Sequence, residues 1–322
     1  MYASLRLIVQ QYGVGSDYGY VCGGWSDSSG NYYFSTIDRF QFPFDSGTAN
    51  QVGKLSGSRG FLSANNSSTY GYVCGGIYYG YHSIIDRFQF PFNSGTANSV
   101  GNLSGSRRAL SANNSSMYGY VCGGYYYSGN YYFFSTIDRF QFPFDSGTAS
   151  NVGKLSGNRW ELSANNSSTY GYICGGFDGS NYRSTIDRFQ FPFDSGTASY
   201  VGNLSGSRYN LSANNSSTYG YVCGGIYYGY HSIIDRFQFP FNSGTASYVG
   251  NLSGDKCALR ANNSSIYGYV CGGVSSGIYY LSTIDRFQFP FNSGTASNVG
   301  NLSGSRCELS ANDGVDFVTM FV

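Results

Sequence analysis

Cysteine is the residue of this chain with the most distinctive chemistry, and its spacing argues for a role in the core. Six of the eight cysteines stand in the heptapeptide YGYVCGG, written YGYICGG once, at intervals of 48 to 52 residues. These six are Cys22, Cys74, Cys122, Cys174, Cys223 and Cys271. None belongs to the CxxC spacing of a metal site, and small buried thiols are common core residues. We therefore expect them in the core. The alternative is a ring of thiolates around an axis, which would hold a metal.

Both histidines lie in a duplicated segment rather than in a converging set of ligands. His82 and His231 occupy the same place in two copies of IYYGYHSIIDRF. A catalytic base or metal ligand needs nearby carboxylates, cysteines or further histidines, whereas these loops supply mainly Tyr, Gly and Ser. The chain also lacks a phosphate-binding glycine motif and a GxSxG nucleophile elbow. We predict that the protein is not an enzyme and carries no metal and no cofactor.

An Asp-Arg pair recurs in all six repeats of the chain, and a further basic residue follows each fourth strand-like segment. A residue type that is present in every repeat has a structural task. We expect these arginines to donate hydrogen bonds to loop carbonyls or to the Asp of an adjacent strand. In the second repeat, the residues to which we assign structural roles are Asp86, Arg87, Arg107, Cys74, Gly75 and Gly76.

The elements that must position these residues are short strands, arranged in six similar units. Each unit contains variants of LSAN, YGYVCG, TIDRFQF and TASNVGNL, with clusters of Gly, Ser, Asn, Asp and Pro between them. No stretch shows the apolar spacing of an amphipathic helix. Such four-stranded units are typical of propeller blades, because one twisted sheet buries both faces only between two neighbours. We predict a single all-β domain over residues 1–322, a six-bladed β-propeller of four-stranded antiparallel blades.

Ring closure is expected to involve both ends of the chain. After the sixth unit, Arg306–Asn312 repeats a first strand, and Phe317–Val322 aligns with YGYVCGG but lacks its glycines. We expect these segments to meet the N-terminal Leu5–Gln11 in a composite sheet; a seventh, composite blade is the alternative. Cys257 and Cys307 occupy equivalent positions in units that closure makes neighbours, so they form either a disulfide or two core thiols.

The units resemble the kelch or galactose-oxidase-type propeller repeat over nearly the whole chain. The resemblance rests on the apolar strand that ends in Gly-Gly at residues 72–76, on the later strand with its aromatic position at residues 85–88, and on Arg107. It departs from kelch in the fourth strand, where Val100 replaces the usual Trp. The segments SGTA, VGNLSGSR and ANNSS are also similar to repeat proteins of bacteriophage tail fibres.

Composition and charge argue against two classes of partner. The formal net charge is +1 and only 11% of the residues are charged, so the chain lacks the excess of Lys and Arg that nucleic acid or an anionic membrane would call for. The longest apolar run near the N-terminus, residues 7–9, is too short for a signal peptide or a membrane-spanning helix. We expect cytoplasmic synthesis without a visible signal peptide, and a virion or an extracellular surface as the favoured location.

Differences between the units concentrate in two connections. One is the loop between the second and third strands, and the other is the residue pair after the conserved Arg. Antiparallel strands place both at one end of the ring, which gives a Tyr-rich variable face and a constant face. Tyr with Gly and Ser is the composition of adaptable binding loops; the alternative is that these loops only pack on one another. The candidate binding residues are Trp25, Tyr78, Tyr79, Tyr81, His82, Arg108, Tyr125, Tyr126, Tyr127, Trp160, Tyr209, Tyr227, Tyr228, Tyr230 and His231.

These patterns favour a non-enzymatic binding or structural propeller, such as a phage or surface fibre component that contacts a glycan or a protein through the variable face. The alternative is an intracellular kelch-type adaptor, or a self-assembling filament subunit, that uses the constant face. A galactose-oxidase-like enzyme is the third hypothesis. The absence of a plausible His, Tyr and Cys copper set argues against it.

Overall fold

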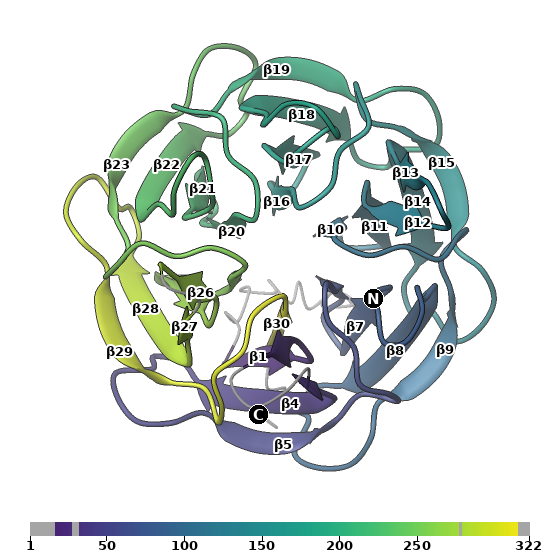
Figure 1. The fold of residues 1–322 in the computed structure, drawn as a ribbon, viewed down its shortest axis with the longest axis horizontal. Coiled ribbons are helices and arrows are strands. Elements are labelled where there is room, and N and C mark those ends of the chain that lie inside the picture. Colours follow the sequence, from purple (N-terminus) through teal and green to yellow (C-terminus); the bar gives the residue numbers. More distant parts are fainter. Residues whose placement is uncertain (1–16, 28–31, 277–278, 315–322) are drawn as a thin grey trace, which may run out of the picture.

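The computed structural model describes residues 17–27, 32–276 and 279–314, which form only β-strands and loops. Six sheets of four antiparallel strands stand around a common axis as the blades of a propeller (Figure 1). The prediction of an all-β, six-bladed ring is confirmed.

In each blade the strands follow one another from the axis outward. The first and second blades consist of β30 (Ser310–Gly314), β1 (Tyr18–Cys22), β4 (Thr36–Gln41) and β5 (Asn50–Lys54), then β6 (Ser63–Asn66), β7 (Tyr70–Cys74), β8 (Ile84–Gln89) and β9 (Asn98–Asn102). The third and fourth consist of β10 (Ser111–Asn114), β11 (Tyr118–Cys122), β14 (Thr136–Gln141) and β15 (Ser150–Lys154), then β16 (Ser163–Asn166), β17 (Tyr170–Cys174), β18 (Thr185–Gln190) and β19 (Ser199–Asn203). The fifth and sixth consist of β20 (Ser212–Asn215), β21 (Tyr219–Cys223), β22 (Ile233–Gln238) and β23 (Ser247–Asn251), then β24 (Arg260–Asn263), β25 (Tyr267–Cys271), β28 (Thr283–Gln288) and β29 (Ser297–Asn301).

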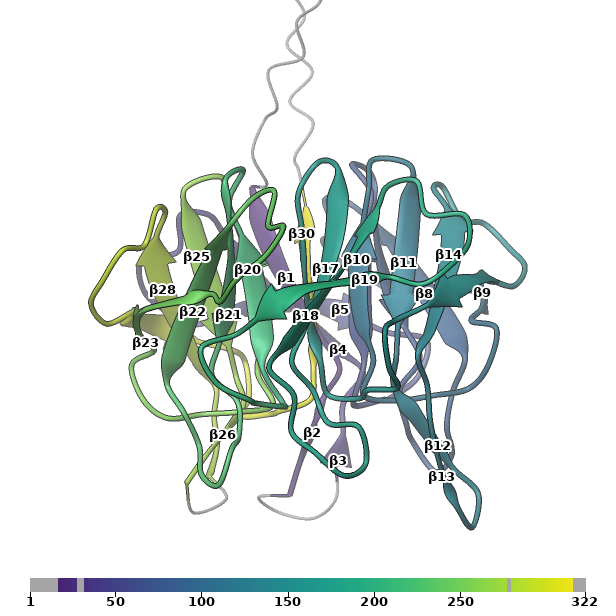
Figure 2. The same cartoon turned by 90° about the horizontal axis from the view of Figure 1, so that it is seen from above.

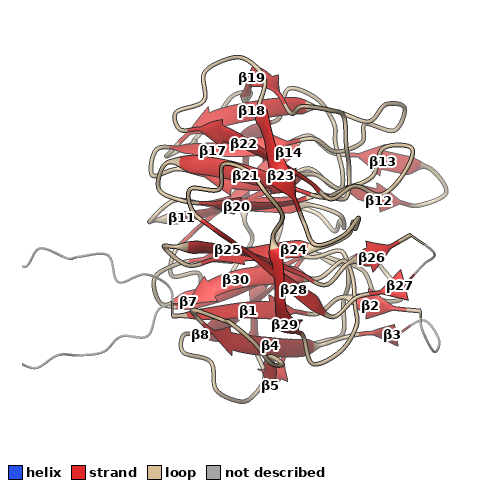
Figure 3. Ribbon diagram, turned by 90° about the vertical axis from the view of Figure 1, so that its left-hand side faces the viewer, coloured by secondary structure: helices blue, strands red, loops and turns tan. Residues whose placement is uncertain are grey.

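Three blades carry an additional short hairpin between their second and third strands. All three hairpins project from the same end of the ring (Figures 2 and 3). They are β2 (Trp25–Ser26) with β3 (Tyr32–Tyr33), β12 (Tyr125–Tyr127) with β13 (Tyr131–Phe133), and β26 (Val274–Ser275) with β27 (Tyr279–Tyr280).

The core lies between adjacent blades, and the alternation of side chains along each second strand builds it. In the second blade Tyr72 and Cys74 pack toward the third blade, whereas Val73 packs toward the first. All three side chains are fully buried. A strand that is buried on both faces reads as a continuous apolar run, which explains the YGYVC pattern. The expected core position of the repeated cysteines is therefore what the structure shows.

The paired glycines after the second strand allow a close approach of the next connection. Gly75 and Gly76 have φ angles of 67° and 100°, in the region that favours glycine. A Cβ on Gly75 would lie 2.7 Å from Leu110 Cδ2 and 2.8 Å from the Arg107 carbonyl oxygen. Both glycines are therefore required by the backbone path.

Ionic contacts connect each blade to the next. Asp86 is fully buried and accepts hydrogen bonds from the Ser56 backbone N–H, the Ser56 hydroxyl and Arg59 Nη2, at 2.9, 2.6 and 2.7 Å. Arg107 pairs in the same way with Asp138 of the third blade, at 3.0 Å. Such buried pairs compensate the charge of each carboxylate and specify how neighbouring blades dock, although the Nε atoms of Arg59 and Arg107 have no hydrogen-bond partner.

The arginine of each Asp-Arg pair contacts a loop of the following blade. Arg87 Nη1 donates to the Phe144 carbonyl at 3.2 Å and pairs with Asp145, and its guanidinium lies 4.4 Å from the centre of the Tyr70 ring. The structure thus places Arg87 on a loop carbonyl and Arg107 on the Asp of an adjacent blade, which are the two kinds of contact that the repeats suggested.

A ring of asparagine side chains also encircles the axis. Asn65 Nδ2 donates to the Asn113 carbonyl at 2.5 Å, Asn113 contacts Asn165 in the same way, and the pattern ends with Asn312 donating to Asn65 at 2.7 Å. The Sγ of Cys74 lies 3.8 Å from Asn65 Oδ1 behind this ring. The amide ring therefore connects all six inner strands.

Closure takes place inside the first blade. Strand β30 pairs with β1, with Cys22 opposite Ser310, so three strands come from the N-terminal part of the chain and one from the C-terminal part. The sequence prediction assigned this pairing to Leu5–Gln11, which lies outside the described residues, as does Phe317–Val322. The structure has six blades and not seven. Cys257 and Cys307 are buried free thiols in one apolar cluster.

Candidate functional site

The two variable connections lie at the same end of the ring, as the antiparallel strands suggested. Backbone bridges join them directly, for example Gly60 with Ile77 and Arg108 with Tyr125. We call this end the variable face. It comprises the described parts of residues 23–35, 75–83, 123–135, 175–184, 224–232 and 272–282, with the pairs 60–61, 108–109, 160–161, 209–210, 257–258 and 307–308.

Near the axis, the aromatic side chains of the variable face pack on one another. Arg108 Nε donates to the Tyr125 hydroxyl at 2.6 Å, and its guanidinium lies 4.6 Å from the centre of the Phe61 ring. The ring centres of Tyr125 and Trp160 are 4.8 Å apart, and those of Trp160 and Tyr209 are 6.2 Å apart. Burial raises the pKa of Tyr209 to about 12. This part of the face has the packed arrangement that was the alternative to ligand binding.

Trp25, Tyr81, Tyr126 and Tyr230 are also partly buried in these contacts. Trp25 stacks on Phe61 at 6.5 Å, and Tyr81 lies 4.9 Å from Tyr126. Tyr230 packs with Trp25 against the apolar cluster that contains the two free thiols. Tyr125 is only 4% exposed, so it offers almost no surface to a ligand.

Several other candidate tyrosines of the variable face are exposed. Tyr79 and Tyr228, the central residues of the duplicated turns, are 96% and 89% exposed. Each lies beside an exposed partner, with ring centres 4.3 Å apart for Tyr78 and Tyr79, and 4.5 Å apart for Tyr227 and Tyr228. The variable face therefore presents two matching pairs of aromatic rings to the solvent.

The duplicated turn holds its exposed tyrosine in an unusual backbone conformation. Tyr79 has a φ of 53°, a value that bulky side chains rarely adopt. The backbone N–H of Tyr78 donates to the Gly80 carbonyl at 3.0 Å, and His82 Nε2 lies 3.1 Å from the Tyr78 carbonyl oxygen. His231 makes the equivalent contact with Tyr227 at 3.0 Å. The structure thus places each histidine against its own turn.

The hairpins supply further exposed tyrosines that the sequence analysis did not single out. Tyr127 was among the candidates and is exposed, and its hairpin partner Tyr131 is exposed as well. Tyr132, Tyr32 and Tyr279 are exposed at comparable sites of the hairpins. Their signal in the sequence was the Tyr doublet at residues 32–33, 131–132 and 279–280.

A second feature that sequence reasoning missed closes the axis at the variable face. Six residues with φ between 50° and 60° form a closed ring in which each backbone N–H donates to the carbonyl of the preceding member, at 2.7 to 3.0 Å. They are Phe61, Ala109, Glu161, Asn210, Ala258 and Glu308. Glu161 and Glu308 are the only glutamates of the chain, and both are buried. The restriction of Glu to these two positions is the signal in the sequence that could have pointed to them.

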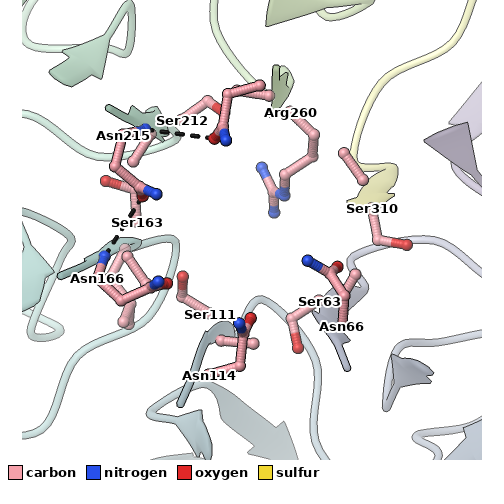
Figure 4. A pocket seen from close by; sticks show the side chains of 18 of the residues that line it. Ser63, Asn66, Ser111, Asn114, Ser163, Asn166, Ser212, Asn215, Arg260 and Ser310 are labelled. Atoms are coloured by element: carbon pink, nitrogen blue, oxygen red, sulfur yellow. Dashed lines mark hydrogen bonds between the residues drawn. The ribbon is translucent and has the colours of Figure 1, made fainter. Parts of the chain in front are cut away.

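The opposite end of the ring leads into a channel along the axis. We call this end the constant face, because its serine and asparagine loops are nearly the same in five of the six blades. A polar vestibule of about 740 Å³, lined by residues such as Asn66, Ser67 and Ser68, meets an inner cavity of about 290 Å³ between the first strands (Figure 4). Asn66 and its equivalents line both spaces, so they are continuous.

The repeated thiols lie away from this channel. Cys74 and its five counterparts are fully buried in the blade interfaces and are not among the residues that line the cavity, and burial raises the pKa of each thiol. A ring of thiolates around the axis is therefore not present. Among the described residues, no three His, Cys, Asp or Glu side chains gather in a metal-binding group. The same ranges contain no helix that is long and apolar enough to cross a membrane.

The closed ring of four-stranded sheets defines the class of this protein as a six-bladed β-propeller. No family model matches the chain, and no curated protein matches it significantly. Among solved structures, the chain is similar to one titled "Structure of YjhT", with a TM-score of 0.66 and 13% identity, over 87% of this chain and 97% of that one. At this identity the similarity concerns the fold alone.

Proposed function

We propose that this propeller is a non-enzymatic recognition protein that contacts a glycan or a protein surface through the exposed tyrosines of its variable face. The observation that carries the proposal is the repeated turn with Tyr79 and Tyr228. An aromatic residue at positive φ costs the fold about 1 to 2 kcal/mol. Packing does not compensate this cost, because both side chains are almost fully exposed. A binding role accounts for a solvent-facing aromatic that is retained twice under such a constraint.

The chemistry of these rings suits a carbohydrate or a polar protein surface. A Tyr side chain provides a flat apolar face and a hydroxyl at a low cost in conformational entropy. The resemblance of the repeats to those of tail fibres supports a place in a phage or surface fibre. The kelch-like motifs agree with a propeller whose function is to bind a partner. Buried thiols with raised pKa values offer no reactive nucleophile, which agrees with a protein that does not catalyse.

Binding to a glycan array and to cells tests the proposal. A variant with Tyr78, Tyr79, Tyr227 and Tyr228 all changed to Ser should bind at least about tenfold more weakly, a loss of ~1.4 kcal/mol. The matched control changes Tyr200 and Tyr248 to Ser, because these tyrosines are exposed on the outer strands β19 and β23. Unchanged binding by the first variant, or an equal loss in the control, would refute the site.

The alternative of an adaptor or a filament subunit rests on the constant face. Its loops present the same Asn-Ser-Ser group five times around the vestibule, with Asp313 at the sixth position, and such a repeated surface would suit a repeated contact. Light scattering of the purified protein distinguishes the two proposals. The mass of a filament increases with protein concentration, whereas the mass of a recognition propeller stays constant.

A further inference from the structure

The axial channel departs from sixfold repetition in its charges. Five of the inner strands begin with Ser, as at Ser63, but β24 begins with Arg260. Strand β30 has Asp313 where the other strands have a second Asn, such as Asn66. These two are the charged side chains that line the inner cavity. Their strand positions differ by three residues, or about 10 Å, so they belong to different levels of the channel.

The guanidinium of Arg260 extends into the middle of the channel with few partners (Figure 4). Nη1 donates to the carbonyl of the adjacent Leu259 at 2.7 Å. Nη2 lies 3.6 Å from Glu308 Oε2, which is too long for a hydrogen bond. A guanidinium has five N–H donors, so most of those of Arg260 have no protein acceptor in the described part of the chain.

Serine hydroxyls at the same level also lack partners. The Oγ atoms of Ser63, Ser163 and Ser310 are buried without a hydrogen bond in the structure, and all three residues line the inner cavity. Buried hydroxyls and guanidinium groups are normally satisfied by protein, water or a ligand. At the level of Arg260, away from Asp313, the inner cavity therefore combines one cation with hydroxyl donors, and its volume has room for about ten water molecules.

The neighbouring carboxyl groups compensate this cation only in part. Burial is the main cause that raises the pKa of both Glu161 and Glu308, and their mutual repulsion raises that of Glu161 further. Burial therefore works against full ionisation of this pair. Arg108 and Arg260 both act to lower the pKa of the two carboxyl groups, so two arginines face this buried pair.

We propose that the inner end of the channel is a binding site for a small oxyanion, a carboxylate, phosphate or sulfate group held by Arg260 and the serine hydroxyls. The planar guanidinium matches such a group with parallel N–H donors. The anion enters from the constant face through the polar vestibule, either as a free ion or as the end of a slender polar ligand. This site is separate from the exposed tyrosines, so it stands or falls independently of the proposed function.

Titration calorimetry of the full chain with inorganic phosphate, sulfate and acetate, in a buffer of low ionic strength, tests the site. The wild type should bind at least one of the three at one ion per chain. Arg260→Ser should weaken that binding at least about tenfold. This variant introduces the residue that the other five strands already have, so the channel should remain intact. Ser163→Ala should weaken binding by a smaller factor, because it removes one donor and no charge.

Arg183→Ser is the matched control, because Arg183 is an exposed arginine outside the channel. Its affinity for the anion should equal that of the wild type. The proposal is overturned if the wild type binds none of the three anions, or if Arg260→Ser binds as tightly as the wild type. It is also overturned if Arg183→Ser causes the same loss. Thermal unfolding of Arg260→Ser, compared with the wild type, separates loss of the site from loss of the fold.

Discussion

Glu161 and Glu308 are the only glutamates of the chain. Both belong to the hydrogen-bonded ring at the variable face, and an oxygen of each carboxyl group is buried without a hydrogen bond. Arg108 and Arg260 lower their pKa values, but burial outweighs this effect. A carboxyl group in such a site is held more easily in its neutral form.

We predict that Glu161→Gln flattens the dependence of stability on pH. Because the pKa of Glu161 is higher in the folded state than its ordinary value of 4.5, its stabilising contribution is complete below that pH and is lost as the pH rises. At about pH 8 the variant should therefore be more stable than the wild type, by roughly 1 kcal/mol. Chemical denaturation at several pH values measures this. A wild-type stability that stays constant above about pH 5 would contradict the prediction.

Asp178→Asn is a control of opposite sign. Burial opposes its ionisation, but hydrogen bonds from the Asn181 and Ser180 backbones and from Arg183 lower the pKa of Asp178. Its contribution to stability is present above its ordinary pKa and is lost as the pH falls. The two variants should therefore change the pH profile in opposite directions.

At the scale of the element, the duplicated turn at residues 77–82 trades stability for presentation of a side chain. Ile77 and Tyr81 bridge its base, and the histidine holds one carbonyl. Tyr79 at its tip is exposed and adopts the left-handed region. Asn tolerates that region far better than an aromatic residue does.

We predict that Tyr79→Asn raises the free energy of unfolding by roughly 0.5 to 1 kcal/mol, because it relieves the backbone strain. The same variant should bind the ligand of the variable face more weakly. Chemical denaturation and the cell-binding assay measure the two effects. Tyr127→Asn is the control, since Tyr127 is exposed but lies in strand β12. An equal gain in stability for both variants would show that the turn is not strained.

At the scale of the whole molecule, the ring brings the two tyrosine turns to opposite sides. The second and fifth blades carry the same loop and are three blades apart, so β7 and β21 face each other across the axis (Figure 1). The two turns share their hydrogen bonds as well as their sequence. A propeller with this pseudo-twofold arrangement presents the same aromatic pair twice to one surface.

The ring is closed without a covalent connection, and this predicts where it opens first. Asn312→Ala removes the amide that connects β30 to the second blade and should lower the free energy of unfolding by about 1 to 3 kcal/mol. Hydrogen exchange should then become faster in β1 and β30. Asn165→Ala removes the equivalent amide from a blade that is covalently continuous. If exchange at β1 and β30 rises equally in both variants, the seam is not the weak point of the ring.

Much of the fold could be predicted because the repeat is local. The apolar run Tyr-Gly-Tyr-Val-Cys predicts a strand that is buried on both faces, and its six copies predict six blades. The role of Asn65 could not be read in this way, since Asn in a Ser-rich segment is typical of a turn. In the structure the Asn65 side chain donates a hydrogen bond to the Asn113 carbonyl of the next blade, 48 residues away.

The candidate site was predictable only in its location. Which connections vary, and that they share one end of the ring, follows from antiparallel strands. Which tyrosines are exposed does not follow, because Tyr125 and Tyr127 belong to the same short strand and to the same Tyr triplet. Tyr125 is buried by Arg108 and Trp160, which come from neighbouring connections, whereas Tyr127 is exposed.

The sequence by itself determined the four strands of each blade, the number of blades and the composition of each face, because side-chain alternation and turn residues act over a few positions. Only the tertiary structure decided which strands close the ring, how six backbone groups form the hydrogen-bonded ring at the variable face, and which charged side chains line the channel. Phe61 meets Glu308, and Arg260 meets the same glutamate, only when the last strand returns to the first blade. Contacts between such distant residues depend on the curvature of the entire ring, which no single repeat encodes.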